Sequence, residues 1–364
     1  MASASPRFPD RFYVVRIVSS DGSRKGQLLA IKLRVLVGDH LAINRPNDVV
    51  AESDLVPLEF SRGAAVRHGS TMWILVSDQP HRGLGPSLLW ALKENATELH
   101  VLADSHTDVL ARQALHFAFP ITVWNVDDRT LTLAQPGPHI ESPPAIREHL
   151  DFVEIITSGG AVAHIEHGIV TGEVLGLEVC RAVTDQYSGE HRLEVGIGAH
   201  DREAFALLHG NKPRIEALSD VVESVRKQRR PGAEPHPFNR LAPERLLRAR
   251  VVASPQLIGA KLVTPCDPPF PRTNVLDVVP CVATASLLSG KEVVVVFTAG
   301  ADPDIVPFAL DARHRINSHA ELIVAMPDTH ITRTNRIALE LAIEPAQFMG
   351  IKPVGIDGEL AFRL

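Results

Sequence analysis

The sequence predicts an α/β protein in which two Rossmann-like βαβαβ repeats flank a smaller α+β module. Apolar strands alternate with amphipathic helices in residues 71–124 and again in residues 291–351. Both segments share a local pattern, which reads "ATELHVLADSH" in the first and "HAELIVAMPDTH" in the second. Continuous apolar strands that alternate with helices are typical of parallel sheets covered on both faces. Each segment is therefore expected to form one βαβαβ half.

Irregular, proline-rich stretches divide the rest of the chain. Residues 133–148 predict a linker, and residues 229–244 predict a second break. Before the first repeat, "RFYVVRIVS" and "LLAIKLRVLVG" are expected to be strands of an antiparallel meander. We therefore expect an N-terminal domain at 1–135, a middle module at 145–229 and a C-terminal segment at 240–364.

The middle module differs in character from the repeats. It begins with a predicted helix, "AIREHLDFVEII", which is followed by the strand-like runs "AVAHIEHGIVTGEV", "LGLEVCRAV" and "HRLEVGIGA". The Ser-Gly turn signal in "TDQYSGE" predicts that the last two runs form a hairpin. Two helices, "DREAFALLHG" and "RIEALSDVVESVRKQRR", are expected to close the module, with Asp201 as the N-cap of the first.

Composition narrows the class of protein. The 364 residues carry a net charge of -6, so no global basic field attracts nucleic acid. The net charge does not exclude a local basic groove. Three cysteines without a CxxC pair disfavour a disulfide framework and a thiolate zinc site. The apolar runs are too short to span a bilayer, and the first residues lack a signal-peptide core. A cytoplasmic protein without a membrane partner is expected.

Acidic residues on the predicted hairpin give the middle module a chemical interpretation. Glu178 in "GLEVCRAV", or Glu173 in "TGEV", lies on one strand, and Glu194 in "RLEVG" lies on the next. This order of a helix, a hairpin with an acid on each strand, and a helix is similar to the core of the PD-(D/E)xK nuclease superfamily. The resemblance covers about residues 145–229. It implies that Glu178 and Glu194 bind Mg²⁺, with Glu173 as a further ligand, and that the ion activates water.

The resemblance has one departure. The lysine that the superfamily places two residues after its second acid is Gly196 in this sequence. His200 or Arg202, from the following turn, would have to neutralise charge in its place. The alternative is that isolated glutamates simply alternate outward on a half-exposed hairpin, which would give a nuclease-like fold without catalysis.

Two further stretches of the sequence are compatible with phosphate binding. Gly196 and Gly198 precede a predicted helix, but a third glycine is missing and Asp201 would repel a phosphate. The basic run at 226–230 and the arginines of "NRLAPERLLRAR" could form a phosphate patch. The simpler interpretation is a solvated helix end, where cations complement the helix dipole.

The repeats carry matched polar residues after their strands. Open α/β sheets bind ligands at the carboxyl ends of their strands. "ADSH" and "PDTH" follow the second strand of each repeat, and further acids follow the first strand. Capping of the next helix is the alternative for Asp104 and Asp328. The candidate ligand residues at these strand ends are Asp78, Asp104, His106, Asp304, Asp328 and His330.

Two functions follow from these patterns. One is a divalent-metal-dependent hydrolase that acts on nucleic acid through the middle module. The other is a non-catalytic ligand-binding or assembly protein built on the duplicated sheets. Gly196 and the acidic pI favour the second, and the hairpin acids favour the first. Taken together, these features favour the hydrolase slightly over the binding protein.

Overall fold

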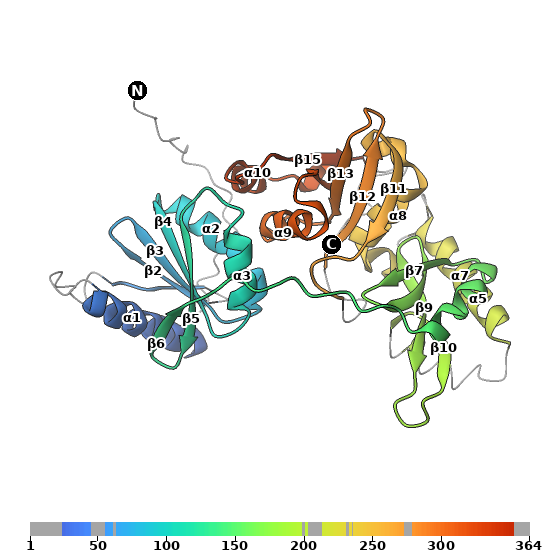
Figure 1. Cartoon of the computed structure of the whole chain (residues 1–364), viewed down its shortest axis with the longest axis horizontal. Helices are drawn as coiled ribbons and strands as arrows, with labels where there is room; N and C mark the ends of the chain where they lie inside the picture. Colours follow the sequence, from blue (N-terminus) through green and yellow to red (C-terminus); the bar gives the residue numbers. More distant parts are fainter. Residues whose placement is uncertain are drawn as a thin grey trace. The chain divides into compact units, whose positions relative to one another are not determined.

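The chain folds as an α/β protein with three sheets, seen in a computed structural model (Figure 1). The structure describes residues 24–44, 55–60, 63–198, 201–202, 213–230, 233–234, 236–272 and 279–352. The chain divides into two compact units. The first contains Met1–Leu115 and Phe119–Pro136, and the second contains His116–Ala118 and Gly137–Leu364.

The first unit is built on a mixed sheet of strand order β1-β2-β3-β4-β5-β6. Strands β3, β4 and β5 are parallel and the other pairs are antiparallel, so residues 71–124 have the expected βαβαβ order. The elements are α1 (Arg24–Asn44), β1 (Leu58–Phe60), β2 (Gly63–His68), β3 (Thr71–Val76), η2 (Pro80–Arg82), α2 (Leu84–Lys93), β4 (Glu98–Ala103), α3 (Thr107–Ala114), β5 (Ile121–Asp127) and β6 (Thr130–Leu133).

The expected N-terminal meander is wrong where the structure describes it. The run "LLAIKLRVLVG", residues 28–38, lies inside helix α1. Its buried residues include Ala30, Leu33, Val37 and Leu41, which recur every three or four positions as the face of a helix does. This face packs against strands β2 and β3. The run "RFYVVRIVS" lies outside the described residues.

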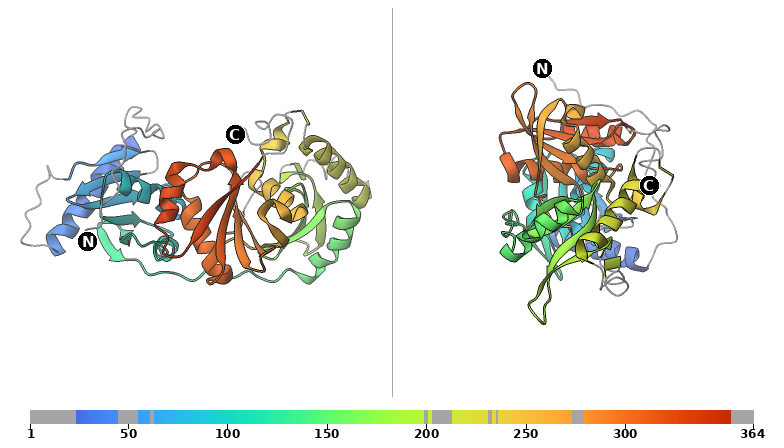
Figure 2. Two further views of the ribbon diagram at one scale, coloured as in Figure 1. Left: turned by 90° about the horizontal axis from the view of Figure 1, so that it is seen from above. Right: turned by 90° about the vertical axis from the view of Figure 1, so that its right-hand side faces the viewer.

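The middle module is an antiparallel sheet of order β10-β9-β8-β7. The predicted hairpin is formed by β9 and β10, and it extends beyond the rest of the sheet (Figures 1 and 2). Helices α5 and α7 cover one face through a shared apolar core. The elements are α4 (Arg147–Leu150), α5 (Phe152–Ser158), β7 (Val162–Glu166), β8 (Ile169–Val174), β9 (Leu177–Thr184), β10 (His191–Val195) and α7 (Arg214–Arg229).

The C-terminal sheet has the order β11-β12-β13-β14-β15, with β13, β14 and β15 parallel as expected for residues 291–351. Strands β11 and β12 are antiparallel. The elements are η3 (Pro237–Arg240), α8 (Pro243–Ala253), η4 (Pro255–Ile258), β11 (Ala260–Cys266), β12 (Cys281–Leu287), β13 (Glu292–Phe297), α9 (Ile305–Asn317), β14 (Glu321–Pro327), η5 (Asp328–His330), α10 (Arg333–Glu340) and β15 (Ala346–Ile351).

The likeness of the two parallel segments extends beyond the predicted repeats. In each case a helix and two antiparallel strands lead into the βαβαβ unit: α1, β1 and β2 in the first unit, and α8, β11 and β12 in the second. Leu247 and Val251 of α8 pack on the C-terminal sheet, as α1 packs on its own sheet. Among the described residues, no helix has the length and apolar character needed to cross a membrane.

Candidate functional site

The middle sheet has one apolar face and one charged face. Val170 and Val174 of β8 belong to the apolar core with α5 and α7. Alternate residues point to the opposite face, because successive side chains on a strand alternate. We call this opposite surface the charged face. Its charged and titratable members on the sheet are His164, Glu166, Glu173, Glu178, Arg181, Arg192 and Glu194.

A β-bulge shapes this face. Thr171 of β8 pairs with Arg181 of β9, but the register shifts after Gly172, so that Glu173 pairs with Glu178. Simple alternation would place Glu178 and Arg181 on opposite faces. The extra residue of the bulge brings them to the same face and aligns two carboxylates on neighbouring strands. Like charges that face each other across two strands are destabilising unless cations neutralise them.

Three arginines bind the Glu178 carboxylate. Arg181 donates from Nε to Oε1 and from Nη2 to Oε2, both at 2.9 Å. Nη1 of Arg202 lies 3.0 Å from Oε1, and Nη2 of Arg272 lies 3.0 Å from Oε2. The residue is only 1% exposed. Burial alone would raise the pKa of Glu178, but the hydrogen bonds and charges of the arginines outweigh burial and lower it.

A second cluster surrounds Glu173. Nη1 of Arg245 lies 2.6 Å from its Oε1, and Nη2 of Arg248 lies 3.3 Å from its Oε2. Both arginines come from α8 and also pair with Glu166. Nε2 of His164 lies 3.6 Å from Oε2 of Glu173. Burial favours a raised pKa, but Arg248 and Arg245 prevail and lower the pKa of Glu173 to about 2.

The structure brings together three of the residues predicted for the nuclease-like site. Arg202 contacts Glu178 and also places its Nε 3.4 Å from Oε2 of Glu194. Glu194 in turn accepts a 2.9 Å hydrogen bond from Nη2 of Arg192. Arg202 thus occupies a charge-neutralising position between the two acids. The fourth predicted catalytic residue, His200, lies outside the described residues.

The chemistry of this face is that of ion pairs. Guanidinium groups engage both oxygens of Glu173, Glu178 and Glu194, the predicted Mg²⁺ ligands. In the part of the chain that the structure describes, no three His, Cys, Asp or Glu side chains are grouped so that they could hold a metal ion. The Mg²⁺ site stays a prediction from the sequence, and the arrangement of the arginines adds no support to it.

The conformation of the turn after Glu194 explains why it contains Gly196 and Asp201. Gly196 has a φ of +137°, and a Cβ built there would lie 2.9 Å from the backbone nitrogen of Arg202. The Asp201 carboxylate accepts a 2.6 Å hydrogen bond from the backbone N–H of Ile197. Asp201 thus satisfies a backbone donor at the entry to the following helical turn. The glycine and the aspartate shape the turn that delivers Arg202 to the charged face.

Gly196→Ala is expected to destabilise the protein by about 1–3 kcal/mol, because it combines an unfavourable backbone conformation with a close contact. Urea denaturation at neutral pH measures this change. Gly189→Ala is the matched control: its φ is +72°, and nothing lies within 4 Å of the added Cβ. An equal loss in both variants would contradict a special role for the contact with Arg202.

The candidate residues of the first unit lie in the loops after strands β3 and β4. Asp78 follows β3, Asp104 and His106 follow β4, and all three are exposed. The His106 ring lies 5.1 Å from the ring of His81, which follows β3. Burial, and then the neighbouring His106, lower the pKa of His81. The loops after two adjacent parallel strands therefore come together through histidines.

The strand-end residues of the second unit form a similar junction. The backbone N–H of Gly300, after β13, donates a 2.8 Å hydrogen bond to Nδ1 of His330, after β14. Burial lowers the pKa of His330, and the neutral imidazole is the form that accepts this bond. Asp304 is buried at the start of α9, whereas Asp328 is exposed.

The capping alternative for Asp104 and Asp328 is wrong. His106, in the left-handed region, occupies the N-cap position of α3, and its side chain makes no capping hydrogen bond. Helix α10 is capped by Thr332, whose hydroxyl accepts a 3.1 Å hydrogen bond from the backbone N–H of Asn335. One extra turn or residue between each aspartate and its helix moves the cap position downstream.

The arginines that α8 contributes to the charged face differ from their interpretation in the sequence. The sequence favours a solvated helix end or a phosphate patch for Arg245 and Arg248, whereas the structure buries them, at 3% and 2% exposed. The strands contain the sequence feature that predicts these buried cations. Acids within apolar strands, such as Glu173 and Glu178, require buried cations nearby, because charged residues are almost never fully buried unpaired.

Comparisons of the chain with protein-family models, with curated proteins and with solved structures found no match.

Proposed function

We propose that this chain is a non-catalytic binding protein. In this proposal, the two α/β sheets present ligand-binding loops at the carboxyl ends of their parallel strands. The middle module then acts as a rigid body, and α8 joins it to the C-terminal sheet of the second unit.

One observation carries the proposal: the buried acids of the middle sheet are matched by arginines. A hydrolytic Mg²⁺ site needs carboxylate oxygens that are free to bind the ion and open positions for water. Both oxygens of Glu178 face guanidinium groups, and the side chain is 1% exposed. A divalent cation would have to displace these arginines and would then leave their charges buried without partners.

The strand ends support the binding half of the proposal. His81 with His106, and His330 with Gly300, connect the loops after adjacent parallel strands in the two sheets. Ligands of open α/β sheets bind at this edge. Burial lowers the pKa of His81 and of His330, and a neutral imidazole can donate or accept a hydrogen bond, which suits a polar ligand.

A metal-dependent nucleic-acid hydrolase is the second candidate. Its support is the juxtaposition of Glu178, Glu194 and Arg202, which are the residues predicted for two metal ligands and a charge-neutralising group. Glu194 is the accessible member of the set, because its side chain is 26% exposed. This residue is therefore the best position at which to separate the two candidates.

Calorimetric titration with Mg²⁺ and Mn²⁺ is expected to give no saturable heat, either with the wild-type protein or with Glu194→Gln. The substitution keeps the size of the side chain and removes the charge that the metal requires. A wild-type site that weakens at least tenfold in Glu194→Gln, about 1.4 kcal/mol, would overturn the proposal. A parallel loss of Mg²⁺-dependent cleavage of single-stranded RNA or plasmid DNA would establish the hydrolase.

A further inference from the structure

Helix α7 ends in a basic run whose members have different roles. Arg229 is buried and donates hydrogen bonds to the carbonyl oxygens of Leu241 at 2.8 Å and Leu175 at 3.1 Å. Arg226, Lys227 and Arg230 are exposed. We call these three residues the basic edge. The fold uses Arg229 to join α7 to its surroundings and leaves the charges of the basic edge in contact with solvent.

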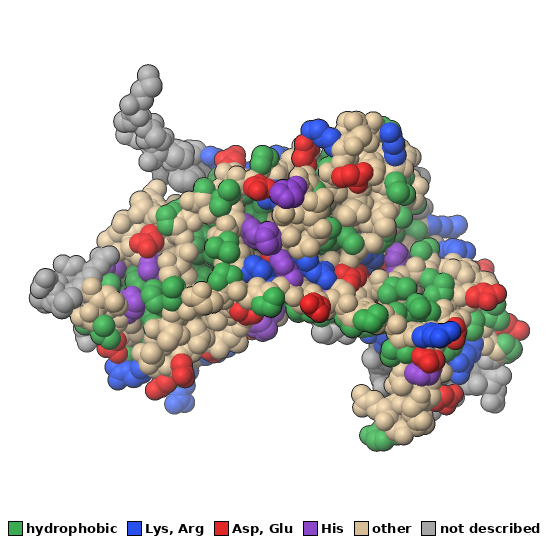
Figure 3. Space-filling model, in the orientation of Figure 1, with side chains coloured by type: hydrophobic (Ala, Val, Ile, Leu, Met, Phe, Trp, Pro, Cys, Tyr) green, Lys and Arg blue, Asp and Glu red, His purple; other side chains and the backbone are tan. Residues whose placement is uncertain are grey.

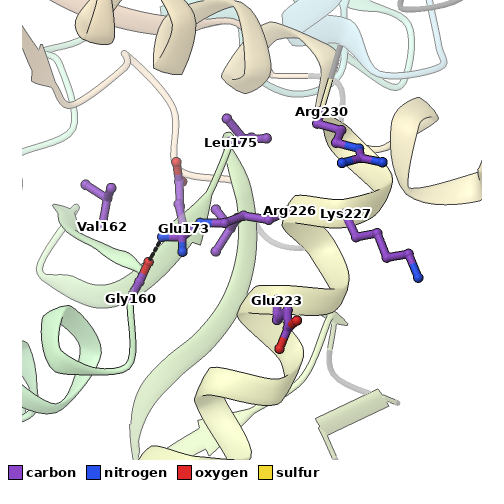
Figure 4. Close-up of a pocket in the computed structure, with 9 residues that line it drawn as sticks. Gly160, Val162, Glu173, Leu175, Glu223, Arg226, Lys227 and Arg230 are labelled. Atoms are coloured by element: carbon purple, nitrogen blue, oxygen red, sulfur yellow. Dashed lines mark hydrogen bonds between the residues drawn. The ribbon is translucent and has the colours of Figure 1, made fainter. Parts of the chain in front are cut away.

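The basic edge borders an open hollow of the middle module. Gly160, Val162 and Leu175 contribute to its lining (Figure 4). Nη2 of Arg226 donates a 2.6 Å hydrogen bond to the carbonyl oxygen of Gly160, which fixes this guanidinium at the rim. Figure 4 shows Lys227 pointing away from Gly160, so the cations are spread around the end of the helix.

The basic edge differs from the charged face in its pairing. Each buried acid of the charged face is matched by arginines. Within the described ranges, by contrast, no carboxylate forms an ion pair with Arg226, Lys227 or Arg230. Glu223 is an acid of the lining, and the carboxylate of Glu173 is already held by α8. On the face drawn in Figure 3, acidic and basic side chains are interspersed.

We propose that the basic edge binds the backbone of single-stranded nucleic acid without reading its sequence. This inference goes beyond the proposed function, whose ligand lies at the strand ends of the two α/β sheets, because the basic edge is a separate site on the middle module. Cations spread around a helix end match an anion that carries charges along its length, rather than one compact phosphate. Two of the three cations are arginines, whose planar fork suits phosphate oxygens. None of the described residues that line the hollow is aromatic, so the proposed contact is with the phosphate backbone and includes no base stacking.

Salt dependence and site-directed variants test the inference. Fluorescence anisotropy would follow binding of labelled single-stranded RNA of mixed sequence, about 20 nucleotides long, in EDTA. Three phosphate contacts predict that log K falls with log salt concentration with a slope of about -2. The double variant Lys227→Gln/Arg230→Gln is expected to weaken binding about tenfold and to make the slope shallower by about 1.4. Arg226 is left in place because it also holds Gly160.

Arg214→Gln is the matched control, because Arg214 is an exposed arginine in the first turn of the same helix. It is expected to keep the affinity within about twofold. No RNA binding at low salt, or an equal loss in the control, would overturn the inference. Equal binding of a poly-glutamate peptide, with the same loss in the double variant, would also overturn it by identifying an acidic protein partner. Binding followed by Mg²⁺-dependent cleavage would leave the basic edge intact and refute only the non-catalytic function.

Discussion

Glu173→Gln is expected to lower the free energy of unfolding by about 3–5 kcal/mol at neutral pH, the largest loss that we predict. The substitution removes one negative charge from a cluster in which Arg245 and Arg248 are 3% and 2% exposed. Glu166 would then be the sole carboxylate that pairs with these two guanidinium groups in the described structure. A buried charge that loses its partner keeps its desolvation cost. Urea denaturation, followed by circular dichroism, measures the loss.

The control for this variant is Glu223→Gln, which removes the same charge from an exposed position on α7. It is expected to change the free energy of unfolding by no more than about 0.5 kcal/mol. A loss of less than about 1 kcal/mol in Glu173→Gln would place the cluster among weak surface ion pairs. The arginines of α8 would then not explain how the middle sheet is held to the C-terminal sheet.

The sequence predicted the parallel parts of the fold because their signal is strong and local. In β13, "EVVVVF" is buried at every position after Glu292, as a central parallel strand must be. Residues 28–38 of helix α1 were expected to be a strand, because this short run is rich in apolar residues. The helical spacing of the apolar residues becomes clear only over several turns. Only the spacing of Leu33, Val37 and Leu41 distinguishes the helix from a strand.

The candidate site depended on features that the sequence does not encode locally. A one-residue bulge decides that Glu178 shares a face with Arg181, and its local signal is a single residue, Gly172, of a type that often marks bulges. The partners Arg245 and Arg272 are distant in sequence and reach the site through tertiary packing. The expectation that His200 or Arg202 lies beside the hairpin acids needs only the adjacent turn, and Arg202 contacts both Glu178 and Glu194. It was therefore within reach of local reasoning.

The contribution of Glu173 to stability is expected to disappear in acid. The pKa of Glu173 in the folded protein is about 2, against an ordinary value of 4.5. A carboxyl group whose pKa is lowered by folding stabilises the protein above its unfolded pKa. This stability is lost as the pH falls through the folded pKa. The difference between the two pKa values corresponds to about 3 kcal/mol of folding stability, and all of it is present at pH 7.

The difference in unfolding free energy between wild type and Glu173→Gln isolates this contribution, because glutamine does not titrate. We expect the difference to be constant from pH 7 to about pH 5 and to shrink by about 2 kcal/mol by pH 3. Urea denaturation series at these pH values provide the measurement, with Glu223→Gln as the variant whose difference stays flat. A difference that is independent of pH would show that Arg248 and Arg245 do not hold Glu173 ionised. The destabilisation in the first experiment would then come from packing, since a protonated or poorly paired Glu173 has no charge interaction to lose.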